Sequence, residues 1–334
     1  MKLVSFIKNG NECAGIFTRG KIFDIYMMHP GLPGSMKETL MKWEETYPAL
    51  LKLLSEIENT PKLQSRGLSL DDVELLAPVP NPESLRDGYA FRQHVETARK
   101  NRGLDMTPVF DSFPVFYFGN HHTVQGAGPV FCMPDHFRNL DFELETAIVI
   151  SRRGKNIPAE QADTYIAGIM ILNDFSARVL QMDEMLLNLG PAKGKDFATA
   201  TGPWLVTLEE LSPFEKLGKN GHTGKSWNLK MTASVNGKIV SEGNLAEMDW
   251  TFAEIIERAS YGAELFPGDI IGSGTVGTGC FLELNGTGRR NDPQYQEQWL
   301  ADGDEVELQV EGLGSLKNQI RAVKTDWSIL KLKK

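Results

Sequence analysis

The stretch LDFELETAIVI, residues 140–150, decides how the fold is interpreted. Read as a β-strand, it places successive side chains on opposite faces. Asp141, Glu143 and Glu145 then share one face, and the same face continues at Ala147 as core. A buried sheet that contains this strand must therefore accommodate carboxylates, and burying an unpaired charge is costly.

Two alternatives account for the spacing of Glu143 and Glu145. On one strand face their Cβ atoms would lie about 7 Å apart. Two buried carboxylates raise each other's pKa unless a positive group lies between them. A hard divalent cation would neutralise both, because Mg²⁺ and Ca²⁺ prefer oxygen ligands. The alternative is a solvated strand face, which is favoured when this strand is considered alone.

The bulk composition excludes several classes of partner and compartment. The chain of 334 residues is long enough for one large or two modest domains with a sizeable core. Its net charge of −9 argues against nucleic acid, which requires a basic surface. Cys13, Cys132 and Cys280 form neither a CxxC motif nor a disulfide framework. The N-terminal apolar run ends at Ile7, and no run approaches the ~20 apolar residues of a membrane span. We therefore expect a cytoplasmic protein.

We expect a mixed, β-rich α+β fold that begins with a small N-terminal domain over residues 1–80. Asn9-Gly10 predicts a hairpin between two short strands. The sequence of residues 36–58 predicts a helix that is interrupted at Pro48. A proline-rich stretch near residue 80 is typical of a domain boundary.

Residues 81–334 are expected to form a larger domain with many strands and a frayed tail at 331–334. A second Asn-Gly pair predicts a hairpin within SVNGKIV. The segments that we interpret as strands are FPVFYFG, ETAIVI, AGIMILND, GPWLVT, LKMTASVNGKIVSEG, DIIGSGTV and DEVELQVEG.

Asp174 ends an apolar strand within ILNDFSARVLQMDE, residues 171–184. Its carboxylate would either bind a ligand or cap the helix that follows, and the cap is the more common role. Arg178 and Gln181 are three residues apart and would share one face of that helix. They would bind an anionic substrate or form an ordinary surface pair.

Lys195 lies in the constrained loop LGPAKGKDFATATGPWL, residues 189–205. The loop lacks the GxxxxGK[ST] spacing of a nucleotide-binding loop. Lys195 would either supply a fixed ammonium to a developing oxyanion or lie on an exposed turn.

His94 follows Asp87 and Tyr89 in the segment RDGYAFRQHV, residues 86–95. A single histidine is more often structural than catalytic. The pair His121-His122 is a second candidate, but no third zinc ligand stands at a recognisable spacing.

Glu283 lies in the apolar run CFLEL, which we interpret as a strand, and it follows the glycine-rich turn that contains Thr275. The glycine spacing does not match a dinucleotide-binding fingerprint. A carboxylate in an apolar strand needs a partner. A histidine is an attractive partner, because a Glu–His pair acts as a general base.

Together these segments resemble the fumarylacetoacetate hydrolase family over most of residues 85–310. The resemblance rests on several motifs in the family's order, and their conjunction is more specific than any single motif. It implies a small N-terminal β-rich domain followed by a rolled mixed β-sheet. The motifs are YAFRQHV, LDFELETA, LNDFSARVLQ, LGPAKGKDFAT, and FPGDIIGSGTV followed by FLEL.

The resemblance also implies a role for each candidate residue. A general base, His94, would be oriented by Glu283, because the family's alternative glutamate position is Thr97 here. Either Arg99 or Arg102 would match a family arginine that follows the histidine, whereas Asp141 matches a family position that is not a metal ligand. The remaining implied roles are metal ligands at Glu143, Glu145, Asp174 and Asp87, contacts to substrate oxygens from Arg178, Gln181 and Lys195, and a pocket lining of Tyr89, Tyr117 and Thr275.

The implied activity is hydrolytic cleavage of a C–C bond in a 1,3-diketo acid, such as fumarylacetoacetate or an acylpyruvate from aromatic catabolism. The implied cofactor is Mg²⁺ or Ca²⁺, with Mn²⁺ as a further possibility, and the implied assembly is a homodimer. Decarboxylation of a β-keto acid or isomerisation of a hydroxy-dienoate on the same fold remains an alternative. A non-enzymatic metal- or ligand-binding protein is a more remote one.

Overall fold

One long mixed sheet carries most of the candidate residues. The computed structural model describes residues 1–332, and within them this sheet has eleven strands. In spatial order its main path is β3 (Lys21–Asp24), β2 (Asn11–Thr18), β1 (Lys2–Lys8), β14 (Thr199–Val206), β12 (Ile166–Asp174), β10 (Leu144–Ile150), β20 (Ile270–Gly272), β5 (Leu85–Gly88) and β6 (Phe116–Gly119). Two further strands, β4 (Glu74–Leu75) and β7 (Val124–Gln125), pair with β1 and β14. The N-terminal strands thus join the rest of the chain through β1 and β14.

A second, five-stranded sheet packs against the first. Its order is β18 (Lys238–Asn244), β17 (Lys230–Val235), β21 (Glu305–Val310), β22 (Gly314–Ala322) and β8 (Gly128–Cys132). Shorter pairs are β9 (Leu140–Asp141) with β13 (Ser176–Ala177), β11 (Gly154–Lys155) with β19 (Glu264–Leu265), and β15 (Glu215–Leu217) with β16 (Lys225–Trp227). The predicted mixed, β-rich class is confirmed.

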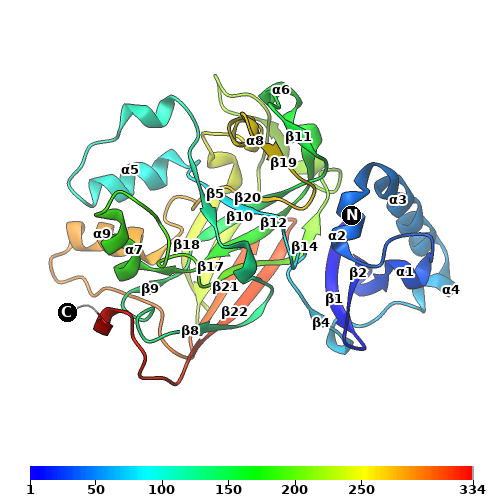
Figure 1. Cartoon of the computed structure of the whole chain (residues 1–334), viewed down its shortest axis with the longest axis horizontal. Helices are drawn as coiled ribbons and strands as arrows, with labels where there is room; N and C mark the ends of the chain where they lie inside the picture. The colour runs from blue at the N-terminus through cyan, green and yellow to red at the C-terminus, as the bar shows by residue number, and fades with distance from the viewer. Residues whose placement is uncertain (333–334) are drawn as a thin grey trace.

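Helices surround the sheets in two groups. The N-terminal group is α1 (Ile25–Met28), α2 (Met36–Met41), α3 (Trp43–Asn59) and α4 (Pro61–Gln64), and the second is α5 (Arg92–Lys100), α6 (Ala159–Ala162), α7 (Arg178–Met185), α8 (Phe252–Ser260) and α9 (Phe281–Asn291). Figure 1 shows the blue N-terminal segment on one side and α5, α7 and α9 on the opposite side. No helix within residues 1–332 has the length and hydropathy needed to cross a membrane.

Both faces of β10 are buried, which explains how this strand bridges two parts of the core. Ile148 belongs to the cluster that includes Leu308 of the second sheet. Ala147 and Val149 belong to a different cluster, together with Leu53 of α3. The face that carries Glu145 therefore runs into apolar core and not into solvent.

Both predicted hairpins are present. Strands β1 and β2 pair along their length, and Asn9 and Gly10 adopt positive φ angles of 52° and 77°. Strands β17 and β18 pair in the same way, with positive φ at Asn236 and Gly237. Asparagine and glycine tolerate this conformation, which matches the twist of the flanking strands.

The predicted helix over 36–58 is interrupted, but the prediction that Pro48 interrupts it is wrong. The break lies at Lys42, between α2 and α3, and Pro48 lies inside α3. Proline removes one backbone donor. Because Pro48 is in the second turn of α3, only the bond to the carbonyl of Glu44 is lost, while buried residues such as Leu53 hold the helix on the sheet.

The predicted continuous strand over residues 140–150 is also wrong in part, because it breaks between β9 and β10. The Phe142 amide donates to the Asp141 carboxylate at 2.9 Å, and the Glu143 amide donates to Asn173 Oδ1 at 3.0 Å. These two amides bond to side chains and not to a neighbouring strand. Glu143 is thereby released from the strand geometry that holds Glu145.

Two further interpretations made from the sequence differ from the structure, and a third extends beyond the described residues. Glu283 lies on helix α9 and not on a strand, because the amides of Phe281 and Leu282 donate to the buried Asp141 carboxylate and so begin a helix. The strand predicted for DIIGSGTV is limited to Ile270–Gly272. The predicted tail at 331–334 includes residues 333–334, which lie outside the described residues.

A test of the sheet packing is Gly168→Ala on β12. A Cβ atom there would lie 2.4 Å from the carbonyl oxygen of Val206 on β14. Since both groups are backbone-anchored, the strands would have to separate, and we expect the free energy of unfolding to fall by about 1–3 kcal/mol.

The matched control is Gly34→Ala, whose Cβ would meet nothing closer than 3.7 Å. Chemical denaturation measures the free energy of unfolding of both variants. Equal stability of the two would contradict the proposed packing of β12 on β14.

Candidate active site

Four predicted carboxylates meet at neighbouring strands of the long sheet. Asp87 lies on β5, Glu145 on β10 and Asp174 at the end of β12, while Glu143 immediately precedes β10. Oxygen atoms of Asp87, Glu143 and Glu145 lie within 4.8 Å of one another. Lys195 links Asp174 to this group, because its ammonium donates to Asp174 at 2.7 Å and also to Glu143. We call Asp87, Glu143, Glu145 and Asp174 the acid cluster.

Burial of the acid cluster excludes the solvated strand face, since none of its members is more than 5% exposed. Burial raises the pKa of Asp87 to about 7. Burial, followed by the charge of Asp87, holds the pKa of Glu145 well above its usual value. Burial also opposes ionisation of Glu143, but Lys195 and Arg178 outweigh it and lower its pKa to about 2. The cluster therefore contains more carboxyl groups than its buried cationic partners can keep ionised.

The donor set of the acid cluster fits a hard divalent cation. Oε2 of Glu145 and Oδ1 of Asp174 are buried and have no hydrogen-bond partner within the described part of the chain. Mg²⁺ and Ca²⁺ prefer carboxylate oxygens, and Mn²⁺ accepts the same donors. The cluster thus offers both the ligand type and the unsatisfied atoms for the ion that the sequence predicts.

Asp174 does not cap the helix that follows it. Helix α7 begins at Arg178, and its N-cap residue is Ala177. The Asp174 Oδ2 atom instead accepts from the Tyr117 hydroxyl at 2.5 Å and from Lys195 Nζ at 2.7 Å. Of the two roles left open by the sequence, the structure favours the ligand-binding one.

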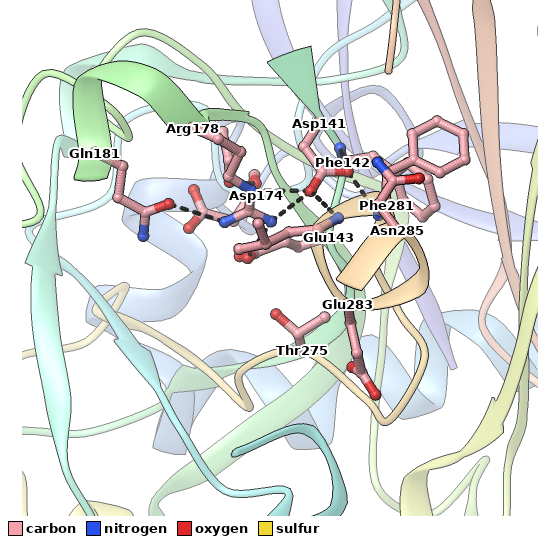
Figure 2. Close-up of polar contacts among 12 residues, drawn as sticks. Asp141, Phe142, Glu143, Asp174, Arg178, Gln181, Thr275, Phe281, Glu283 and Asn285 are labelled. Carbon is pink, nitrogen blue, oxygen red and sulfur yellow. Dashed lines mark hydrogen bonds and ion pairs between the residues drawn. The ribbon is translucent and has the colours of Figure 1, made fainter. Parts of the chain in front are cut away.

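Arg178 and Gln181 form a connected pair at the edge of the acid cluster, and they are not a surface pair (Figure 2). Arg178 is 3% exposed and donates through Nη2 to Glu143 at 2.9 Å. Its Nη1 atom donates to Gln181 Oε1 at 2.9 Å. Because this bond occupies the amide oxygen, the amide NH₂ of Gln181 is the group left to donate to a ligand.

Asp141 connects Arg178 to helix α9, as the dashed contacts in Figure 2 show. Its buried carboxylate accepts from Arg178 Nε at 2.9 Å. It also accepts from the amides of Phe281 at 2.8 Å and Leu282 at 2.9 Å, at the start of α9. A negative charge is favourable at a helix N-terminus. Asp141 therefore fixes the acid cluster relative to the helix that carries Glu283.

His94 and Glu283 form a buried pair from two different helices, α5 and α9. His94 Nδ1 lies 2.6 Å from Glu283 Oε2. The Tyr89 ring packs edge-on against the His94 ring, with centroids 5.6 Å apart. A carboxylate partner at Nδ1 leaves Nε2 as the proton acceptor of a neutral imidazole. The pair has the arrangement expected of a general base and the residue that orients it.

Thr275 and Asn101 each donate a hydrogen bond to a residue of the site. The Thr275 hydroxyl donates to Glu145 Oε1 at 3.0 Å. Asn101 Nδ2 donates to the carbonyl oxygen of Glu283 at 3.1 Å. Sequence reasoning missed Asn101, the C-cap residue of α5, although it follows His94 by about two helical turns, a spacing that could have indicated it.

A cavity of about 520 Å³ brings most of the predicted residues together. Arg102 lines it and Arg99 does not, which distinguishes the two arginines that the sequence left open. Arg289 also lines it and was not predicted. His121 and His122 do not line it. The predicted residues in its wall are Asp87, Tyr89, His94, Tyr117, Glu143, Arg178, Gln181, Lys195, Thr275 and Glu283. Glu145 and Asp174 do not line it, but both contact groups that do, Thr275 and Lys195.

Comparison with known families gives one match that covers most of the chain. The family model described as fumarylacetoacetate (FAA) hydrolase, C-terminal, matches residues 84–321. Among curated proteins, the chain is 30% identical over 295 residues to the oxaloacetate tautomerase YisK of Bacillus subtilis, covering 86% of this chain and 87% of that protein. It is 28% identical over 320 residues to fumarylacetoacetase of Arabidopsis thaliana, covering 79% and 74%.

Solved structures share the fold. A putative HpcE protein from Mycobacterium smegmatis superposes with a TM-score of 0.71 at 22% identity, covering 97% of this chain and all (100%) of that chain. A fumarylacetoacetate hydrolase from Exiguobacterium antarcticum superposes with a TM-score of 0.67 at 23% identity over the same shares. Both superpositions cover the N-terminal part of the chain as well as residues 84–321, which match the family model.

A first prediction concerns Asp141→Asn. An amide cannot neutralise Arg178, and its NH₂ would face the backbone donors of α9, so Arg178 and Glu283 would shift relative to each other. We expect turnover to fall about 10²-fold, the usual effect of a small misplacement of catalytic groups.

Asp135→Asn is the matched control. Asp135 is also buried and accepts from Ser328 Oγ at 2.7 Å and the Ile329 amide at 2.8 Å, away from the cavity. It should lose stability in chemical denaturation but keep its turnover. Equal loss of turnover in both variants would contradict the role given to Asp141.

A second prediction concerns cation binding. Because an ion would relieve repulsion in the acid cluster, added Mg²⁺ or Ca²⁺ should stabilise the EDTA-treated protein, by about 2.7 kcal/mol at 100 times its Kd. Thermal denaturation measures this gain. Glu145→Gln should lose most of it, whereas Glu160→Gln on the exposed face of α6 should keep it. An undiminished gain in Glu145→Gln would argue against this site.

Proposed function

The chain belongs to the fumarylacetoacetate hydrolase family, and we propose that it is a divalent-metal-dependent hydrolase that cleaves a C–C bond in a 1,3-diketo acid. One observation carries this proposal. The His94–Glu283 pair, at 2.6 Å, opens into the same cavity as Asp87 and Glu143 of the acid cluster. A water-activating base and a site for a substrate enolate are the two parts that this reaction needs.

The acid cluster would hold the cation through Glu143, Glu145, Asp174 and Asp87. When bound, such an ion polarises the substrate oxygens and stabilises an enolate as a Lewis acid. The protein groups around the acid cluster orient its carboxylates. The Tyr117 hydroxyl and the Lys195 ammonium both bond to Asp174 and limit where its carboxylate can point.

His94 supplies the proton transfer in the proposed reaction. Its Nε2 atom takes a proton from water while Glu283 holds Nδ1. The hydroxide adds to the acyl carbonyl carbon, and the bond between that carbon and the neighbouring CH₂ breaks. The electron pair leaves as an enolate, which a proton then converts to the keto acid. One water is consumed, and the products are a carboxylic acid and an oxo acid, which is a 2-oxo acid when the substrate is an acylpyruvate.

Lys195 and Gln181 are the donors available to the developing oxyanion. Lys195 is 5% exposed, and its pKa is raised despite burial, because Asp174 and Glu143 lie beside it. Its ammonium is therefore a fixed positive charge at the cavity. In comparable sites one such donor contributes about 3 kcal/mol to transition-state stabilisation.

Tautomerisation of a β-keto acid is a second candidate, which the names of several relatives favour. Curated relatives from Bacillus subtilis and Bos taurus, at 30% and 29% identity, are named oxaloacetate tautomerases. This reaction moves a proton between oxygen and carbon and adds no water. The same acid cluster would hold the enol acid, and His94 would carry the proton.

A third prediction tests the role of His94. His94→Ala should lower kcat for diketo-acid hydrolysis by about 10²–10⁴-fold, the usual contribution of a general base. His122→Ala is the control, because His122 is exposed and outside the cavity. Hydrolysis at an unchanged rate in His94→Ala would remove the general-base assignment.

The choice between the two reactions rests on the fate of water. The wild-type protein with Mg²⁺ is incubated in ¹⁸O-labelled water with fumarylacetoacetate, acetylpyruvate or oxaloacetate. Hydrolysis places one ¹⁸O in the product carboxylic acid, and mass spectrometry detects it. Rapid loss of enol absorbance from oxaloacetate without any cleavage of the diketo acids would instead favour the tautomerase.

A further inference from the structure

A second space opens beside the active-site cavity. It has a volume of about 290 Å³, and we call it the side chamber. Tyr89, Arg102 and Val115 line both spaces and therefore form the boundary between them. The side chamber is thus a direct neighbour of the cavity and not a separate surface hollow.

Helix α5 presents adjacent faces to the two spaces. His94 and Ala98 line the cavity, whereas Val95 and Arg99 line the side chamber. The Tyr89 ring contacts His94 and also forms part of the chamber wall. The side chamber therefore lies next to the proposed general base.

The wall of the side chamber is mainly apolar and aromatic. Phe110 and Phe113 come from the segment between α5 and β6, and Trp250 closes another side. Trp250 is held in place, because its Nε1 atom donates to the Phe110 carbonyl at 2.9 Å. Val109 and Val115 are 56% and 48% exposed although they line this space. An apolar group bound in the chamber would cover surface that otherwise faces water.

We propose that the side chamber receives the acyl group of the substrate, so that the protein prefers 1,3-diketo acids with an extended apolar acyl group. This inference rests on the proposed function. The enolate end of the substrate would bind at the cation held by the acid cluster, and the carbonyl that water attacks must lie beside His94. The remaining substituent of that carbonyl then projects past His94 and Tyr89, where the side chamber begins.

The charge of the wall distinguishes an apolar acyl group from one that ends in a carboxylate. The wall contains two guanidinium groups, those of Arg99 and Arg102. The Nε atoms of both are occupied, because Arg99 donates to the Asp105 carbonyl at 2.6 Å and Arg102 donates to the Ala98 carbonyl at 3.2 Å. Phe110 and Phe113 offer no hydrogen bond to a carboxylate, which would lose water without compensation against them. The part of the wall away from the two arginines therefore suits hydrocarbon better than a second acid.

The test compares kcat/KM for acetyl-, butanoyl-, hexanoyl- and benzoylpyruvate and for an acylpyruvate whose chain ends in a carboxylate. Burial of each added methylene should raise kcat/KM about fourfold until the chamber is filled. A flat profile, or a larger gain for the carboxylate-ended chain than for the apolar chain of equal length, would overturn the inference. If the wild type still hydrolyses acetylpyruvate when the side-chamber inference fails, the proposed hydrolysis is not contradicted.

Val109→Trp places a large side chain at the chamber wall and should bring the ratio of kcat/KM for hexanoyl- over acetylpyruvate close to one. Leu104→Trp is the matched control, because Leu104 lies in the same segment, is 48% exposed and lines neither space. It should keep the wild-type ratio. A ratio that falls equally in both variants would refute the chamber as the acyl site.

Calorimetry on the His94→Ala variant separates this inference from the proposed reaction. The same acylpyruvates are titrated with Mg²⁺ present, and the Kd should fall with chain length even where nothing is turned over. If no diketo acid is hydrolysed by the wild type, the proposed hydrolysis fails, and a Kd that still tightens with length supports the side chamber. A Kd independent of chain length overturns it.

Discussion

Asp87, Glu143, Glu145 and Asp174 repel one another inside the long sheet, where almost no water reaches them. Lys195 and Arg178 offset part of this repulsion, and they lower the pKa of Glu143 as a result. Burial, and after it the charge of a neighbouring carboxylate, raises the pKa values of Asp87 and Glu145. Folding these acids into one cluster therefore requires both buried cationic side chains, and it leaves a place where a hard cation would be favourable.

The surrounding architecture holds this charge in place. Strand β10 is buried on both faces, between the N-terminal helices and the second sheet, so Glu145 cannot turn toward solvent. Asp141 then ties the cluster to α9 through the amides of Phe281 and Leu282. Helix α9 carries Glu283, which contacts His94 on α5. A chain of buried polar contacts thus links the acid cluster to the proposed general base.

Both proposed reactions use the acid cluster in the same way and differ in what His94 does. Hydrolysis needs His94 to activate water beside a bound enolate, whereas tautomerisation needs it only to carry a proton. The side chamber adds a constraint on the substrate, because it begins where Tyr89 packs on His94. In these proposals, reaction type and substrate range would both depend on residues at or beside one helix, α5.

The sequence by itself determined the turns, the strand-forming segments and the residue types of the site, because local spacing and side-chain chemistry decide these. It predicted the Asn9-Gly10 hairpin correctly, and its resemblance to the family selected the carboxylates that cluster. It failed where a distant partner decides the local structure: the Asp141 carboxylate turns the apolar run around Glu283 into a helix. Only the tertiary structure decided that Glu143 and Glu145 are buried, that Asp174 is no cap and that Arg102 reaches the cavity, since each depends on contacts between segments far apart in the chain.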